Sequence, residues 1–188
     1  MSTYITQAVV LNKSNYKDYD LKFNLYTLEH GKIAALAKGA KKITSKLNAH
    51  LEFFSLSKIM IAKGASFNRL AGAQLVKKYK NINSDTAKTV IALYFLEVIN
   101  LSVKYDFKDD VVFEILIRFM AQVDQSQNRY DDLLYLNKSL FELLDHLGYR
   151  PQLKSSKQKG LITQFNKIIM EISDQEVKSY GMLARLFG

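Results

Sequence analysis

The chain has 188 residues, 48% of them hydrophobic and 24% charged, a balance typical of folded domains and not of a disordered protein. It contains no apolar run of about 18 residues, no secretion leader and no cysteine, which argues against a membrane span, an exported protein and thiolate or disulfide chemistry. We therefore expect a cytoplasmic protein. The formal net charge of +9 is large enough to indicate an anionic partner.

Residues 1–80 have the pattern of a small β-barrel. Turn residues separate five short runs rich in β-branched and aromatic residues, at 4–13, 21–28, 32–39, 53–64 and 67–78. The sequence EHGK predicts a hairpin with Gly31 at positive φ, and KGAS at 63–66 predicts a second one. Five strands with a long polar connection favour an OB-type barrel, with an SH3-like barrel as the alternative. We expect Phe23 and Phe67 in the core of this barrel.

Residues 81–188 change to a helical period, with Ser84 expected as the first N-cap. Three helices are predicted from apolar stripes at 87, 91, 94, 98 and 101, at 112, 116, 119 and 123, and at 133, 136, 140, 143 and 147. Two shorter helices are expected near 161–172 and 174–187, after an exposed loop at 150–160. The predicted fold class is α+β and multidomain: a five-stranded barrel at 1–80 followed by an all-α domain at 81–188.

No pattern in the chain indicates a catalytic or metal site. The three histidines, at 30, 50 and 146, are far apart and have no neighbours at metal-ligand spacing. Two matches to S-x-x-K, at 14–17 and 55–58, lie in strand or turn context and not at a helix start. The acidic pairs at 109–110 and 131–132 suit the positive ends of helix dipoles. We therefore expect no enzyme activity, no cofactor and no metal.

Basic residues concentrate in residues 1–80, which hold 14 Lys or Arg and 4 Asp or Glu, whereas residues 81–188 hold 13 and 14. The densest stretch, AKGAKKITSK, starts at Ala37. Tyr16 and Tyr19, in the first polar connection, add rings that nucleobases can stack on, as in many grooves for single-stranded nucleic acid. The candidate nucleic-acid-binding residues are Lys13, Lys17, Lys38, Lys41, Lys42, Lys46 and Arg69. A basic excess that serves only solubility is the alternative.

Four stretches, in this order, resemble the RecO family of bacterial recombination mediators: QAVVLNKSNYKDYDLKFNLYTLEHGKIAALAKGAKK, LEFFSLSKIMIAKG, YFLEVINL and LFELLDHLGYRPQL. The resemblance implies an OB barrel with a helical domain, DNA binding without bond cleavage, annealing of complementary strands, and loading of RecA together with RecR. It implies DNA contacts for Lys38, Lys41 and Lys42, and Lys46 follows by proximity and charge. Many members carry a four-cysteine zinc site where this chain reads KSSKQKG, so the resemblance is to a zinc-less variant. Lys154, Lys157 and Lys159 of that stretch are either further DNA contacts or a solvated loop.

The resemblance also implies that the helical domain binds the acidic, hydrophobic-ended tail of the single-stranded-DNA-binding protein. Arg118 is a candidate cation for that tail, and an ion pair with Glu114 is the alternative. Two other functions stay open. One is an adaptor whose basic barrel docks acidic protein tails, and the other is an OB-type RNA-binding factor.

Overall fold

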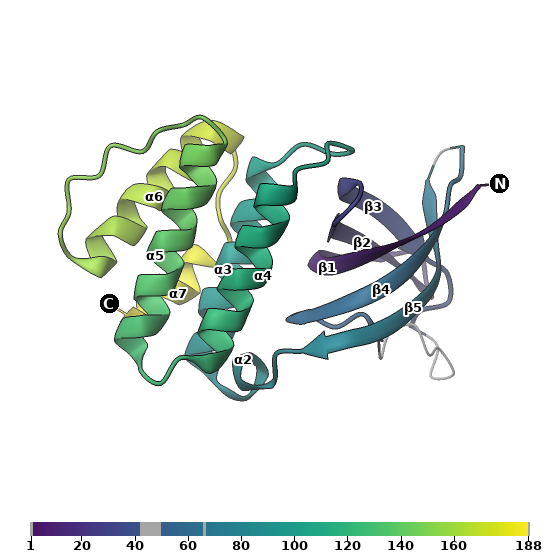
Figure 1. Ribbon diagram of the computed structural model, residues 1–188, viewed down its shortest axis with the longest axis horizontal. Coiled ribbons are helices and arrows are strands. Elements are labelled where there is room, and N and C mark those ends of the chain that lie inside the picture. Colours follow the sequence, from purple (N-terminus) through teal and green to yellow (C-terminus); the bar gives the residue numbers. More distant parts are fainter. Residues whose placement is uncertain (1, 42–49, 66, 188) are drawn as a thin grey trace. The chain divides into compact units, whose positions relative to one another are not determined.

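The computed structural model describes residues 2–41, 50–65 and 67–187 (Figure 1). The chain divides into two compact units. The first comprises Met1–Lys78 and Val103–Phe113, and the second comprises Tyr79–Ser102 and Glu114–Gly188. The first crossing between them lies after Lys78. The return of residues 103–113 to the first unit is a feature that the sequence analysis did not anticipate.

The first unit is a closed barrel of five strands in the order β1-β2-β3-β5-β4. The strands are β1 Thr3–Tyr16, β2 Asp20–Thr27, β3 Gly31–Ala37, β4 Ser55–Ala62 and β5 Asn68–Lys78. All neighbours are antiparallel except β3 and β5, which pair in parallel at Ala35–Asn68 and Leu36–Arg69. The predicted five-stranded OB-type barrel is therefore confirmed.

Alternating side chains of every strand fill the barrel, and Phe23 is fully buried among them as predicted. Gly31 adopts the expected positive φ, 61°, at the hairpin between β2 and β3. Phe67 was predicted to lie in the core, and this prediction is wrong: its side chain is 45% exposed. Phe67 precedes β5 and lies in the connection, so strand alternation does not direct it inward.

Residues 103–113, which we call the strap, complete the barrel beside the start of β3. Strand β5 pairs with β3 only at Ala35 and Leu36, close to the end of β3. The strap pairs instead with the beginning of β3, which is called its near end below. Tyr105 and Lys32 form a parallel bridge, and the Asp106 amide donates to the Lys32 carbonyl at 2.8 Å. The Tyr26 hydroxyl donates to the Asp109 carbonyl at 3.1 Å. The strap is therefore attached to the barrel through both β2 and β3.

The second unit is helical. Its helices are α2 Lys80–Ser84, α3 Thr86–Ser102, α4 Asp110–Gln125, α5 Arg129–His146, α6 Gln158–Ser173 and α7 Tyr180–Phe187. The first residues of α4 belong to the first unit, and the helix belongs to the second unit from Glu114 on. The predicted apolar stripes of α3, α4 and α5 are buried, apart from the half-buried Leu101 and Leu147. None of the helices in the described part of the chain is long and apolar enough to cross a membrane.

Three details of the helical prediction are wrong. Asp85 caps α3, since its Oδ1 accepts from the amides of Ala87 and Lys88 at 2.9 and 3.1 Å, whereas Ser84 ends α2. Helix α7 begins only at Tyr180, because the Glu97 carboxylate holds the two preceding amides in a non-helical turn. Arg118 forms an ion pair, as the alternative to tail binding expected, but its partner is Glu142 of α5 and not Glu114.

Candidate nucleic-acid interface

Two cations lie in one row across the outer face of the barrel. Lys22 of β2 is paired in register with Leu36 of β3, and Leu36 is paired with Arg69 of β5. Residues that are directly paired across strands point to the same face of a sheet. Lys22 is half-buried and Arg69 is exposed, so both side chains reach the surface on either side of an apolar Leu36.

The turn after β3 packs against the turn between β1 and β2. The Gly39 amide donates to Asp20 Oδ1 at 2.8 Å, and the Lys41 amide donates to the Tyr19 carbonyl at 3.1 Å. The Lys41 ammonium also donates to the carbonyls of Lys17 and Asp18 at 3.4 and 3.3 Å. These contacts bring three predicted binding residues, Lys17, Lys38 and Lys41, to the same end of the barrel.

The predicted site residues differ in how far the structure exposes them. Lys17, Lys38, Lys41 and Arg69 are exposed. Lys13 is half-buried: a bulge after Val10 aligns it with the inward-facing Phe23, and its Nζ lies 5.9 Å from the centre of that ring. It therefore lies off the outer face that carries Lys22 and Arg69. Lys42 and Lys46 fall outside the described residues, so the structure does not place them.

An open groove of about 410 Å³ lies on the same outer face. Lys22 and Ala34 lie along β2 and β3, Phe67 comes from the connection to β5, Asn68 is the first residue of β5, and Tyr105 and Asp106 come from the strap. The Phe67 ring lies 6.1 Å from the ring of Tyr16, which links the β4–β5 connection to the end of β1. In OB folds the usual oligonucleotide surface consists of the β2–β3 face together with the β1–β2 and β4–β5 connections.

Tyr105 is held firmly in this groove. The Lys32 ammonium lies 4.2 Å from the centre of its ring and donates to the Val103 carbonyl at 3.2 Å, while the Lys32 side chain is only 5% exposed. Burial lowers the pKa of this ammonium. Burial raises the pKa of Tyr105. A side-chain hydrogen bond between Asn24 and the Tyr105 hydroxyl acts in the opposite direction and lowers it. Sequence reasoning missed Tyr105, since its position along the chain is among the helices.

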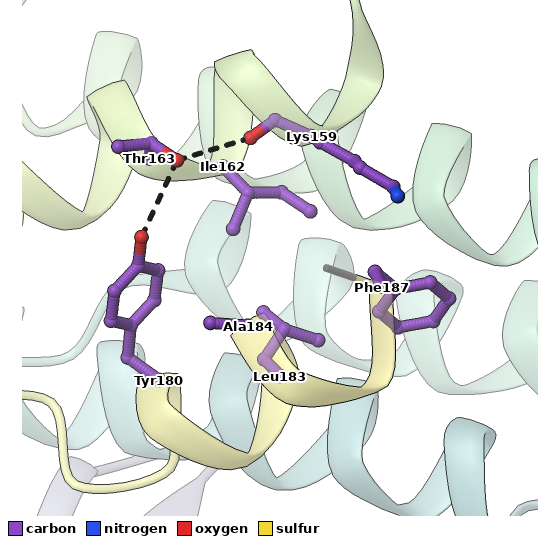
Figure 2. Close-up of a pocket in the computed structure, with 7 residues that line it drawn as sticks. All are labelled: Lys159, Ile162, Thr163, Tyr180, Leu183, Ala184 and Phe187. Atoms are coloured by element: carbon purple, nitrogen blue, oxygen red, sulfur yellow. Dashed lines mark hydrogen bonds between the residues drawn. The ribbon is translucent and has the colours of Figure 1, made fainter.

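A second cavity lies between α6 and α7 in the helical unit. It has a volume of about 190 Å³ and is lined mainly by apolar groups, including Ile162, Leu183 and Phe187. Figure 2 shows Lys159 at its rim and the Thr163 hydroxyl bonded to Tyr180, with an oxygen separation of 3.3 Å. Lys159 was predicted in an exposed loop but belongs to the first turn of α6.

Neither site is arranged to hold a metal. Among residues 2–41, 50–65 and 67–187, no group of three or more histidine or acidic side chains is close enough to bind an ion. Both described sites offer cations and apolar or aromatic surface, so binding of an anionic ligand is the chemistry that they suit.

The comparisons with known proteins agree with this arrangement. The model for the family "Recombination protein O N terminal" matches residues 1–79. The DNA repair protein RecO of Thermoanaerobacter sp. (strain X514) is 30% identical over 148 residues, 79% of this chain and 59% of the relative. The proteins of the same name from Dehalococcoides mccartyi (strain ATCC BAA-2266 / KCTC 15142 / 195) and Synechococcus elongatus (strain ATCC 33912 / PCC 7942 / FACHB-805) are 26% and 28% identical over 149 and 150 residues.

These two alignments cover 79% and 80% of this chain and 58% and 56% of the relatives, so the chain spans a little over half the length of the RecO proteins that it matches. The family match covers the barrel, and the relatives extend the similarity well into the helical unit. The chain is therefore similar to RecO proteins over its barrel and over much of its helical unit.

Proposed function

We propose that this protein is a non-enzymatic DNA-binding recombination mediator in DNA repair. Its barrel would bind single- and double-stranded DNA, and the protein would anneal complementary strands and assist RecA loading together with RecR. The observation that carries the proposal is the outer face of the barrel, where Lys22 and two exposed rings line one groove and Arg69 is exposed in the same cross-strand row as Lys22. The names of the relatives, DNA repair protein RecO, support the role in repair.

The chemistry of this face suits phosphates better than small metabolites. Lysine ammonium groups bind phosphate as point charges and need little fixed geometry. Three exposed cations, Lys17, Lys38 and Lys41, lie at one end of the same barrel. Such contacts release condensed counterions, so affinity for DNA should fall steeply as salt rises.

Fluorescence anisotropy with labelled single- and double-stranded oligonucleotides across a salt series tests the proposal. The variant Lys38→Gln, Lys41→Gln, Arg69→Gln removes three charges but keeps hydrogen-bond donors. For single strands it should reduce the slope of log affinity against log salt by about 2, because each lost phosphate contact contributes about 0.7. The matched control replaces Lys138, Lys167 and Arg185, all exposed in the helical unit, by Gln.

A control slope that falls as much as the barrel variant's would move the DNA surface away from the barrel. Binding that ignores salt would contradict phosphate contact altogether. A separate Lys42→Gln, Lys46→Gln variant tests the two residues outside the described range. If an acidic peptide displaced DNA and bound more tightly at equal salt, the adaptor function would be favoured. Preference for RNA of the same sequence would favour the RNA-binding alternative.

We further propose that the cavity between α6 and α7 receives the acidic, hydrophobic-ended tail of the single-stranded-DNA-binding protein. Its apolar walls suit the hydrophobic end, and Lys159 at the rim suits the acidic part. Lys159→Glu should weaken binding of such a peptide, whereas Lys167→Glu, exposed on the same helix but away from the cavity lining, should not. Equal effects of the two substitutions would exclude this cavity as the docking site.

A further inference from the structure

We propose that the groove between Phe67 and Tyr105 receives one unpaired nucleobase, with the adjoining phosphate on Lys22 and Arg69. This inference rests on the proposed DNA binding and adds a contact that only single-stranded DNA can make. Neither ring belongs to the lysine-rich stretch at 37–46, so the slot uses other residues than that stretch.

The two rings are accessible, but their positions differ in rigidity. Phe67 is 45% exposed and Tyr105 is 47% exposed, and both border the same groove. Lys32 and Asn24 fix Tyr105, whose exposed surface borders the groove. A ring held in place before binding loses little conformational entropy when a base stacks on it. Tyr105 is therefore a preorganised stacking platform.

The charges around the groove orient a nucleotide. Lys22 lines it, and the exposed Arg69 lies in the same cross-strand row as Lys22, on the other side of Leu36, so two cations on this face serve the phosphate. Asp106 lines the strap side, and a carboxylate repels phosphate. The uncharged base must then lie toward Asp106 and Tyr105. Ala34, with its small side chain, keeps the strand surface between the two ends low.

The dimensions of the groove also agree with a small planar ligand. Its volume of about 410 Å³ falls within the range of small-molecule sites, which is about 300–1,000 Å³. A base that remains paired in a duplex does not expose its ring faces, whereas each base of a single strand does. The slot therefore discriminates between unpaired and paired DNA, while the lysines of the proposed function bind both.

The test compares wild-type protein with Phe67→Leu, Tyr105→Leu and Tyr105→Phe, with Phe107→Leu as control. Phe107 is an aromatic residue of the same strap, 67% exposed, and it does not line the groove. The probes are a single-stranded oligonucleotide, the corresponding duplex, and a single strand of abasic residues with the same phosphates. Anisotropy gives the affinity for each probe, and circular dichroism verifies that each variant is folded.

Loss of either ring should weaken binding of the single strand about 5- to 150-fold, the range for one base stacked on an aromatic side chain. Binding of the duplex and the abasic strand should stay within about twofold, since neither presents an accessible base face. Phe107→Leu should behave like wild type, and Tyr105→Phe, which keeps the ring but loses the hydrogen bond to Asn24, should lose much less affinity than Tyr105→Leu. Position 67 lies in the connection between β4 and β5 and not in the strap. Phe67→Leu therefore tests the slot independently if Tyr105→Leu loosens the strap.

Equal losses for single strand, duplex and abasic strand, or no loss for any of them, would overturn the base slot while salt-dependent DNA binding still stood. An effect of Phe107→Leu as large as that of Tyr105→Leu would also overturn it, because the strap and not the ring would then matter. If wild-type protein bound none of the three probes, the proposed function itself would fail, which is a different result.

Discussion

Substitution of Gly31 by Ala tests whether the strap is docked on the barrel as described. Gly31 has a φ of 61°, and a Cβ at this position would lie 1.9 Å from the Phe107 carbonyl oxygen. The left-handed backbone alone costs an alanine about 1–2 kcal/mol. The overlap is with backbone, so the strap must also move, which places at risk the hydrogen bond from Asp106 to Lys32 and the contact of Lys32 with Tyr105. Each of these contributes about 1 kcal/mol.

The expected total loss for Gly31→Ala is therefore about 3–4 kcal/mol. Gly148 supplies a matched control, because it also has a positive φ, 88°, but a Cβ there would meet nothing within 4 Å. Gly148→Ala should cost only the backbone contribution, about 1–2 kcal/mol. The assay is urea denaturation followed by circular dichroism and tyrosine fluorescence, with the slope against urea compared between variants.

Asparagine separates the two contributions, since it tolerates the left-handed region but still carries a Cβ. Gly148→Asn should recover most of the stability that Gly148→Ala loses, whereas Gly31→Asn should remain nearly as unstable as Gly31→Ala. Recovery of stability by Asn at position 31 would refute the reasoning. It would mean that only the backbone angle matters there and that the Phe107 carbonyl does not lie against Gly31.

Three further predictions concern the stability of the two units. Asp85→Ala should lower the free energy of unfolding by about 1–2 kcal/mol, because the cap of α3 and the Arg129 ion pair are lost, whereas Ser84→Ala should change it by less than about 0.5 kcal/mol; thermal denaturation distinguishes these. Phe119→Ala should lower the free energy of unfolding by about 3–5 kcal/mol in urea denaturation, because Phe119 is fully buried with its ring centre 4.1 Å from that of Phe95. The control is Phe141→Ala, at an exposed position; if Phe119→Ala lowered the free energy of unfolding as little as this control, the prediction would be contradicted. Burial raises the pKa of Tyr26 and Tyr94, so the native state retains protons that the unfolded state releases, and the contribution of these two tyrosines to stability should be constant below about pH 10 and fall above it. Urea midpoints between pH 8 and 11 should show a smaller fall for Tyr94→Phe than for wild type.

The elements that sequence predicts well are those whose pattern is local. The stripes at Leu116 and Phe119 repeat along one chain segment, and each points to the same buried face whatever the neighbouring helices do. The hairpin at Gly31 is likewise fixed by a backbone angle that few other residues adopt. Asp85 and Ser84 show the limit of such signals, because both are good caps and only hydrogen bonds to Ala87 and Lys88 distinguish them.

The candidate site depends on non-local pairing, and that is why sequence located it only in part. The concentration of lysines in the first half is visible in composition, but the face on which each one lies is set by register. One bulge after Val10 is enough to turn Lys13 toward Phe23. Tyr105 reaches the groove only because the near end of β3 accepts a strap from far along the chain. Neither fact has a signal within a short window of sequence.

The strap makes the barrel depend on residues beyond its five strands. Lys32 is buried with its ammonium against the Val103 carbonyl and the Tyr105 ring. A chain that ended at residue 80 would lose both of these contacts, and their loss makes burial of the Lys32 charge less favourable. The beginning of β3, where the strap pairs, would also become an open edge. The same loss removes one wall of the groove, because Tyr105 and Asp106 belong to the strap. The proposed binding face of the barrel therefore depends on residues that follow α3 in the chain.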